Sequence, residues 1–240
     1  NASALEPGNI SIGTDAGFNQ IAGSIQNTFI GNGAGAAVTD GTYNTIIGWH
    51  AGVSLIDGSS NTLVGTDAGA SLDGGENSNT MVGHLAGSLT DGGNTNTFIG
   101  TNSGLNNATG GNNVCVGNYA GHNFTDGNDN VCIGPESLFD VISTSSANIA
   151  IGHGAGPTVA SGGSSAQNST ISIGEDAGHY SYIGPVDNTV DNSIYIGSYA
   201  TVPTDGQSQL SRFVLGGGRD GGVNSASKLL MYGGVEDVSE

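Results

Sequence analysis

A nine-residue phrase recurs along this chain at a nearly constant interval. Its clearest copies read Asn-Thr-x-(Ile/Val)-Gly-x-x-Ala-Gly and begin at Asn27, Asn44, Asn61 and Asn79. The first glycine of the phrase, here called the marker glycine, recurs at steps of 17 or 18 residues as far as Gly152, and at steps of 22, 23 and 19 beyond it. The complete series is Gly13, Gly31, Gly48, Gly65, Gly83, Gly100, Gly117, Gly134, Gly152, Gly174, Gly197 and Gly216. Such a period indicates one structural unit repeated along an axis, which leaves little room for an active site built from converging loops.

The residues before each marker glycine predict a short β-strand. The residue directly before it is aliphatic in every copy and β-branched in all but one, and β-branched residues favour strands. A glycine directly after it opposes a helix. The residue two positions earlier is mostly Thr, Val or Ile, and side chains two apart in a strand share one face. We expect these two columns to point into the coil.

The rest of the repeat predicts a corner and a return leg. A small residue such as Ala34 follows the marker glycine by three positions, and Asp-Gly turns such as Asp40-Gly41 close the repeat. We therefore predict an all-β fold, a parallel β-solenoid (β-roll) with coils of 17–18 residues, whose neighbouring strands lie about 4.8 Å apart. About twelve coils fill residues 1–216, irregular from about residue 153, and residues 217–240 form a C-terminal cap or an interchain segment.

An unbroken column of asparagines precedes the predicted strands. Its members are Asn9, Asn27, Asn44, Asn61, Asn79, Asn96, Asn113, Asn130 and Asn148. Stacked asparagines favour a ladder in which each amide side chain bonds to those above and below it. A row of ligand-binding amides is the alternative interpretation.

The column between the two strand columns is apolar in seven successive coils. It consists of Phe29, Ile46, Leu63, Met81, Phe98, Cys115 and Cys132. If its neighbours point inward, this column points outward, and an exposed apolar stripe of that length favours aggregation. We therefore predict an interchain stripe that further copies of the chain cover, which gives a homotrimeric fibre. A wider coil that keeps both faces inside one chain is the alternative.

The charge balance excludes several classes of partner. The net charge is −18, and residues 1–211 contain no lysine or arginine. Because nothing neutralises phosphate, we expect no nucleic-acid binding and no attraction to anionic membranes. No apolar run approaches the roughly 20 residues that a membrane-spanning helix needs, so we expect no membrane insertion. The lack of trypsin sites in the repeats suits an exposed extracellular protein, and a chain that begins within the pattern is expected to be a piece of a longer one.

The two cysteines, Cys115 and Cys132, occupy the same position in successive repeats. Neighbours in register on parallel strands have poor geometry for a disulfide, so we expect two packed free thiols. The pair also offers too few ligands for a structural metal site.

No motif predicts catalysis, so we expect no enzyme, no cofactor and no metal. The five histidines fall at different places in the repeat, and no metalloprotease or nucleophile-elbow motif is present. Four acidic residues, Asp15, Asp67, Glu136 and Asp176, follow their marker glycines by two positions on different coils, and we interpret them as solvated corner residues. A carboxylate pair that cleaves polysaccharide and a calcium ion at the acidic turn 126–129 are the alternatives.

Recognition of a receptor needs exposed aromatic side chains beside polar groups. The candidates are Trp49, His50, Tyr119, His122 and Phe124. Trp49 is the single tryptophan and occupies a predicted corner, where side chains face solvent. Local packing against the next coil is the alternative role for this side chain.

The repeats resemble two families of fibre. The copy at residues 148–156, Asn-Ile-Ala-Ile-Gly-His-Gly-Ala-Gly, resembles head repeats of trimeric autotransporter adhesins. The longer Asn-Thr-x-Ile-Gly-x-x-Ala-Gly form with its turn-rich spacer resembles stalk repeats of bacteriophage tail fibres, over residues 9–216. The resemblance implies a trimeric, parallel β-roll that binds a surface and lies outside the cell, on a virion or on a bacterial surface.

The expected function is a structural and adhesive fibre segment, a phage tail fibre or a bacterial surface adhesin, that projects or forms a surface-binding tip. Its expected partners are its own copies and a cell-surface glycan or protein receptor. An ice-binding β-solenoid is an alternative, because Thr28, Thr45, Thr62, Thr80 and Thr97 align. Their predicted inward direction and the single Thr per coil count against it. A polysaccharide-depolymerising tailspike is the remaining alternative.

Overall fold

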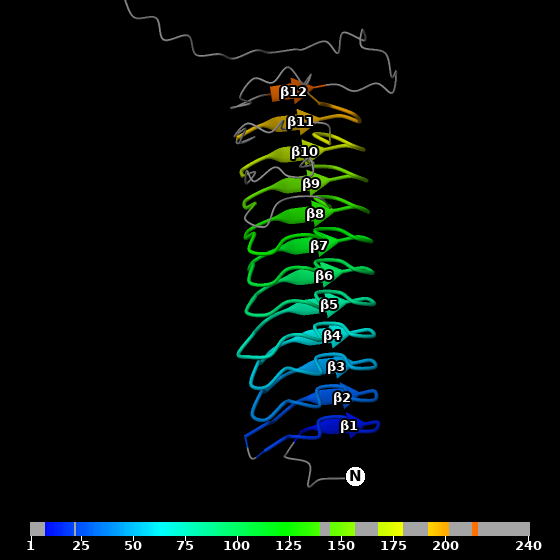
Figure 1. Ribbon diagram of the computed structural model, residues 1–240, viewed down its shortest axis with the longest axis vertical. Coiled ribbons are helices and arrows are strands. Elements are labelled where there is room, and N and C mark those ends of the chain that lie inside the picture. The colour runs from blue at the N-terminus through cyan, green and yellow to red at the C-terminus, as the bar shows by residue number, and fades with distance from the viewer. Residues whose placement is uncertain are drawn as a thin grey trace, which may run out of the picture.

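The chain forms one parallel β-sheet coiled into a solenoid, in a computed structural model that describes residues 8–21, 23–139, 145–156, 168–179, 192–201 and 213–215 (Figure 1). Twelve strands pair in chain order, each parallel to the next. Their bounds are β1 Ile10–Ile12, β2 Thr28–Ile30, β3 Thr45–Ile47, β4 Thr62–Val64, β5 Thr80–Val82, β6 Thr97–Ile99, β7 Val114–Val116, β8 Val131–Ile133, β9 Ile149–Ile151, β10 Ile171–Ile173, β11 Ile194–Ile196 and β12 Phe213–Leu215. The predicted all-β parallel β-solenoid is confirmed, and the described residues contain no helix.

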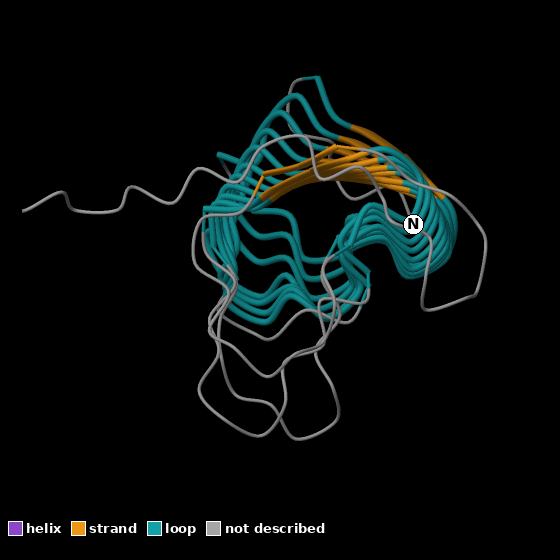
Figure 2. Cartoon of the chain, turned by 90° about the horizontal axis from the view of Figure 1, so that it is seen from above, coloured by secondary structure: helices purple, strands orange, loops and turns teal. Residues whose placement is uncertain are grey.

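One sequence repeat makes one turn of the solenoid. Each strand is three residues long and ends directly before a marker glycine. Equivalent residues of successive repeats pair across the sheet, as Thr28 pairs with Thr45 and Ile30 with Ile47. Seen along the axis, the strands superpose on one side of the coil, and the loops close its other sides (Figure 2).

The side chains of the strands point in the reverse of the predicted directions. In β2 to β8 the middle residue is buried within its own coil, and the residues on either side of it are partly or fully exposed. The predicted interchain stripe is therefore the interior of a single chain, since each of its members is 0% exposed: Phe29, Ile46, Leu63, Met81, Phe98, Cys115 and Cys132. The prediction failed because β-branched residues fit the outer surface of a sheet as well as its inner one.

Three columns of side chains fill the interior. The middle strand residue packs with the small Ala or Ser that follows the corner and with a residue of the return leg such as Val38. Where the strand residue is large, the return-leg residue of the same coil is smaller, and the reverse also occurs. The large Phe98 shares its coil with Asn107, and the small Cys115 shares its coil with Phe124. This compensation favours a close-packed interior.

The marker glycines are required where consecutive coils touch at the corner. Gly65 has a φ of +138°, a region that residues with side chains rarely adopt. A Cβ atom on Gly65 would lie 2.3 Å from the carbonyl oxygen of Gly83 in the next coil. Gly134 has the same relation to Gly152, at 2.6 Å. The repeated glycine thus decides how closely one coil stacks on the next.

The asparagine column is a ladder that mainly joins side chains to the main chain. Asn44 accepts a hydrogen bond from the backbone N–H of Asn61 at 2.9 Å and donates one to the carbonyl of Gly58 at 2.8 Å. Equivalent bonds recur along the column. The structural role is confirmed, and the predicted bond between side chains is the minor component, as from Asn130 to Asn113 at 3.0 Å. The ladder satisfies backbone groups that the coil would otherwise bury without partners.

The two cysteines are buried free thiols, as predicted. Cys115 and Cys132 pair across β7 and β8. Burial, together with a hydrogen bond to Cys115, raises the pKa of the Cys132 thiol well above its ordinary value. Because the thiolate is the reactive form, Cys132 is a packing residue and not a nucleophile.

The longer steps between marker glycines do not disturb the sheet. Strands β9 to β12 keep their parallel register although the steps there lengthen to 22, 23 and 19 residues. Most of the additional residues lie outside the described ranges. Residues 217–240, for which a cap or interchain segment is predicted, also lie outside them.

Candidate functional site

The outer face of the sheet carries two columns of partly exposed side chains. The column directly before the marker glycine includes Ile99, Ile133, Ile151, Ile173 and Ile196, which are 37–41% exposed. The other column is the first residue of each strand. Because the strands pair in register, both columns run along the axis of the solenoid (Figure 1). The exposed apolar surface is therefore this face and not the middle column.

The outer face has two parts that differ in chemistry. We call its part on β2 to β6 the mixed face, because the first column there is Thr and the second is Ile or Val. Its threonines are Thr28, Thr45, Thr62, Thr80 and Thr97. We call its part on β7 to β11 the aliphatic face, whose members are Val114, Val116, Val131, Ile133, Ile149, Ile151, Ile171, Ile173, Ile194 and Ile196. Monomeric soluble proteins rarely expose a contiguous apolar surface of this kind.

The turn side of the coil brings three carboxylates together. Asp73, Glu76 and Asp91 place their oxygens within 4.8 Å of one another, and the described residues hold no other group of three such ligands. Glu76 is buried, and its carboxylate accepts hydrogen bonds from the backbone N–H groups of Gly74 and Gly92, both at 2.9 Å. Calcium prefers such oxygens but takes about six to eight of them. We interpret the role of the cluster as structural, because Glu76 joins two neighbouring coils through these hydrogen bonds.

Asp73 raises the pKa of Asp91 above its ordinary value, through a side-chain hydrogen bond and through charge repulsion. Burial and the charge of Glu76 add smaller contributions in the same direction. Residues 1–211 contain no lysine or arginine that would offset this repulsion. We call the turn side that carries Asp73, Glu76 and Asp91 the acidic edge. Repulsion among its carboxylates destabilises the folded coil at neutral pH, and its negative charge repels anionic ligands.

The acidic turn at residues 126–129 ties neighbouring coils together. Asp126 accepts a hydrogen bond from Thr109, and Asn128 accepts one from the backbone N–H of Gly111, both at 2.8 Å. The three-carboxylate cluster lies elsewhere on the chain. The side chains of this turn thus serve coil stacking.

Two of the predicted receptor-binding residues form a stacked pair at the corner. Trp49 is 49% exposed, and its ring centroid lies 3.6 Å from that of His50 with an interplanar angle of 17°. His50 lies over the preceding coil, where a Cβ atom on Gly33 would come within 2.7 Å of its ring. The indole is therefore about half exposed and stacks on His50 of its own coil, and it is His50 that packs against the preceding coil.

The other predicted aromatic candidates divide between surface and core. Tyr119 and His122 lie together on the coil of β7 with ring centroids 5.2 Å apart, and Phe139 of the next coil joins them. Phe124 is 0% exposed and packs in the interior, so it is a core residue and not a receptor contact. Its position on the return leg turns it inward to fill the space beside the small Cys115. Sequence reasoning missed Phe139, although it stands one repeat after His122 and the period places the two side by side.

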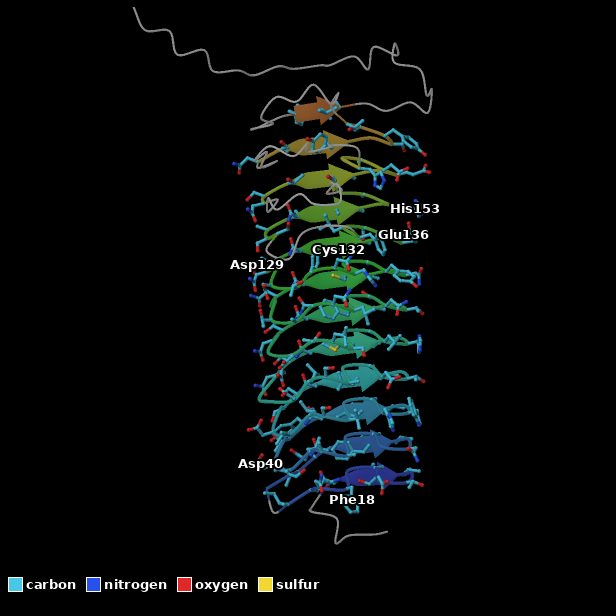
Figure 3. All side chains as sticks on the ribbon, in the orientation of Figure 1. Phe18, Asp40, Asp129, Cys132, Glu136 and His153 are labelled. Atoms are coloured by element: carbon cyan, nitrogen blue, oxygen red, sulfur yellow. The ribbon has the colours of Figure 1, made fainter. Side chains whose placement is uncertain are left out.

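The four acidic corner residues lie on separate coils. Asp15, Asp67, Glu136 and Asp176 share a left-handed backbone conformation, and they follow β1, β4, β8 and β10, so no two of them lie on adjacent coils. Glu136 and His153 project from the corner side with a carboxylate oxygen and Nε2 4.0 Å apart and both side chains about half exposed (Figure 3). A solvated contact at this distance contributes little to stability.

No protein-family model, no curated protein and no solved structure matches this chain. In the ranges that the structure describes, no helix is long and apolar enough to cross a membrane.

Proposed function

We propose that this chain is a segment of an extracellular fibre, in which three parallel copies pack the outer faces of their sheets around a common axis. The observation that carries the proposal is the pair of exposed columns along that face, which is apolar apart from five threonines. A lone chain would leave this surface in contact with water along the whole described sheet, which favours association.

A second and a third copy of the same chain fit this face better than an unrelated partner. The face repeats with the coil, so a partner that covers it throughout needs the same length and the same repeat. Soluble oligomers favour closed symmetry, and a threefold axis parallel to the rod brings three such faces together. Each Å² of apolar area removed from water there contributes about 25 cal/mol. The adhesin and tail-fibre repeats that the sequence resembles also imply three copies.

The remaining surfaces suit a fibre that projects into the medium. The corner and turn sides carry acidic and amide side chains, and the net charge of −18 keeps such a rod soluble. Residues 1–211 contain no lysine or arginine and therefore no site for trypsin, which suits a protein exposed to proteases on a virion or a bacterial surface. Aromatic residues at the corner provide candidate receptor contacts, so the fibre is adhesive as well as structural.

Sedimentation equilibrium of the purified chain tests this proposal. The expected species has three times the 23.7 kDa mass of the chain at micromolar concentration. A dimer would support burial of the sheet face between copies and contradict the threefold axis. A stable monomer would overturn the fibre proposal, because the apolar columns would then be compatible with solvent.

One observation favours a second candidate function, the binding of ice. The five aligned threonines point outward on the mixed face, which removes the objection that they face the interior. Their hydroxyls repeat about every 4.8 Å beside a column of branched methyl groups, a regular surface that orders water. The objection that each coil offers one Thr still stands. Thermal hysteresis from a monomeric chain would support ice binding, and its absence from that species would exclude it.

A further inference from the structure

Three aromatic rings from two neighbouring coils meet on the corner side of the solenoid. Tyr119 and His122 follow β7, Phe139 follows β8, and the ring centroids lie 5.0 to 5.8 Å apart. We call these three residues the ring cluster. All three side chains are partly exposed, so each ring contacts the coil on one side and solvent on another. The described residues contain no second group of three rings in mutual contact.

The fold does not require an aromatic residue at Tyr119. Its φ is +56°, and the equivalent corner position adopts a left-handed backbone in other coils with Gly33, Asp67, Leu85 or Asn102. Glycine, aspartate and asparagine take this conformation more readily than tyrosine does. The conformation recurs at this corner from coil to coil, with Tyr199 as a second tyrosine, so it belongs to the fold. Because the corner accepts several residue types, the ring of Tyr119 is available for a contact at the surface.

Polar groups surround the ring cluster. The Nδ1 atom of His122 lies 2.9 Å from Oδ1 of Asn123, which also accepts a hydrogen bond from Asn106 at 2.9 Å, so the imidazole plane is held in place. On the next coil Glu136 occupies the position equivalent to Tyr119, and its half-exposed carboxylate projects from the corner side (Figure 3). Flat apolar rings thus stand beside amide and carboxylate groups.

Charge restricts the kind of ligand that fits. With no lysine or arginine in residues 1–211, the corner offers an anionic ligand nothing to pair with. A neutral sugar has the complementary chemistry, because a pyranose presents an apolar C–H face to aromatic rings and hydroxyl groups to carboxylate and amide partners.

We propose that the ring cluster and Glu136 bind a neutral hexose or N-acetylhexosamine unit of a cell-surface glycan. Because the ring planes of Tyr119 and Phe139 meet at 76°, the sugar ring stacks on the face of Tyr119 and its edge contacts Phe139, while its hydroxyls donate to the Glu136 carboxylate. This inference rests on the adhesive part of the proposed function and adds the class of ligand. A small surface site of this kind binds with a Kd of about 1 mM, and three copies around one fibre gain affinity through avidity.

Calorimetry and saturation-transfer NMR on the full chain test the site, with triacetylchitotriose and maltotriose as neutral probes and polygalacturonate as the acidic probe. We expect at least one neutral probe to bind and polygalacturonate not to bind. Tyr119→Ala and Phe139→Ala should each weaken binding at least tenfold, whereas Tyr119→Phe keeps the ring and most of the affinity. The matched control is Tyr43→Ala, which removes an exposed ring on another coil, outside the candidate receptor contacts, and should leave binding unchanged.

Three results would overturn the site: failure of both neutral probes at millimolar concentration, binding that survives both alanine variants, or preference for polygalacturonate. Circular dichroism of each variant verifies that the solenoid persists. Sedimentation of the same samples separates this inference from the fibre proposal. A monomer that binds through Tyr119 retains the site without the fibre, and a trimer that binds neither neutral probe retains the fibre without the site.

Discussion

The mixed face and the aliphatic face share one backbone and differ in what they present to their surroundings. Strands in both parts are three residues long, stay in register and end at a marker glycine. Between β6 and β7 the first outward column changes from Thr to Val. The coil tolerates this change because its shape is determined by the glycine corner, the asparagine ladder and the filled interior, and not by the outward side chains. Outward positions are therefore free to serve association in one part and a more hydrated contact in the other.

The largest expected effect comes from charging the two faces in turn. The pair Ile133→Lys and Ile151→Lys places two cations in the aliphatic face, and we expect association to weaken at least ~100-fold, because buried unpaired charges cost several kcal/mol. The matched pair Ile30→Lys and Ile47→Lys on the mixed face should weaken it less, since the threonines there keep more water nearby. Sedimentation equilibrium measures both.

The control for this comparison is Ile133→Val with Ile151→Val, which keeps the face apolar and should leave the proposed trimer intact. Equal effects of the two lysine pairs would show that the faces do not differ in function. No effect of either pair would remove the outer face as an interface.

Replacing a marker glycine should damage both parts equally. Gly65→Ala and Gly134→Ala put a Cβ atom 2.3 Å and 2.6 Å from the carbonyl oxygen of the next coil. We expect each to lower the free energy of unfolding by roughly 3 kcal/mol, in urea denaturation followed by circular dichroism.

Gly74→Ala is the matched glycine control. Its backbone is not left-handed, and the nearest atom to a new Cβ is 3.6 Å away, so we expect it to be neutral or to stabilise by about 0.5 kcal/mol. If Gly65→Ala were as mild as Gly74→Ala, the corner would not control the stacking of coils.

Interrupting the asparagine ladder should have an intermediate effect. Asn96→Ala leaves the buried N–H of Asn113 without its partner at 2.9 Å, and a buried group of this kind costs about 2 kcal/mol. The carbonyl of Gly110 loses the bond from Asn96 at 2.8 Å and keeps the one from Asn107 at 2.8 Å. Asn94→Ala removes an exposed side chain that bonds to the N–H of Asn77 at 2.6 Å, where water can substitute, so we expect a smaller loss. Equal losses in thermal melts would argue against a buried ladder.

The smallest effect concerns the acidic edge beside the mixed face. Because Asp73 raises the pKa of Asp91 in the folded chain, the folded state binds that proton more tightly than the unfolded state does. The resulting destabilisation is fully present at pH 7 and declines as the pH falls through the raised pKa of Asp91. We therefore expect the melting temperature to rise slightly from pH 7 toward pH 4.5.

Asp91→Asn should raise the melting temperature at pH 7 and reduce its pH dependence. Asp40→Asn, on the same edge but outside the carboxylate cluster, should leave that dependence in place. A melting temperature that falls on mild acidification in the unmodified chain would contradict this account of the cluster.

Much of the fold could be predicted because the repeated residues restrict the backbone strongly. Each repeat contains a marker glycine, a β-branched segment before it and, in several copies, an Asp-Gly turn. These features predict where each strand lies and how neighbouring strands pair. The position of the ladder bears on the direction of the middle column. Asn27 directly precedes β2 and stands two positions before Phe29, so in extended backbone the two side chains share a face. A buried asparagine ladder thus requires a buried middle column.

The candidate site was less predictable, because aromatic residues recur in several columns. Phe124 and Phe139 are both phenylalanines after a marker glycine, yet one fills the core and the other joins the ring cluster. Their exposure depends on where each falls on the return leg, which composition does not reveal. The large Phe124 occupies the space that the small Cys115 leaves, so the burial of Phe124 depends on the size of the residue opposite it in the coil.

The sequence by itself determined the repeating coil, its period and its parallel register, because glycine and β-branched residues restrict the backbone locally. Only the tertiary structure decided which strand columns line the interior and which face outward. That choice depends on whether opposing side chains fill the closed coil, a property of pairs far apart in each repeat. The surface available for association followed from it.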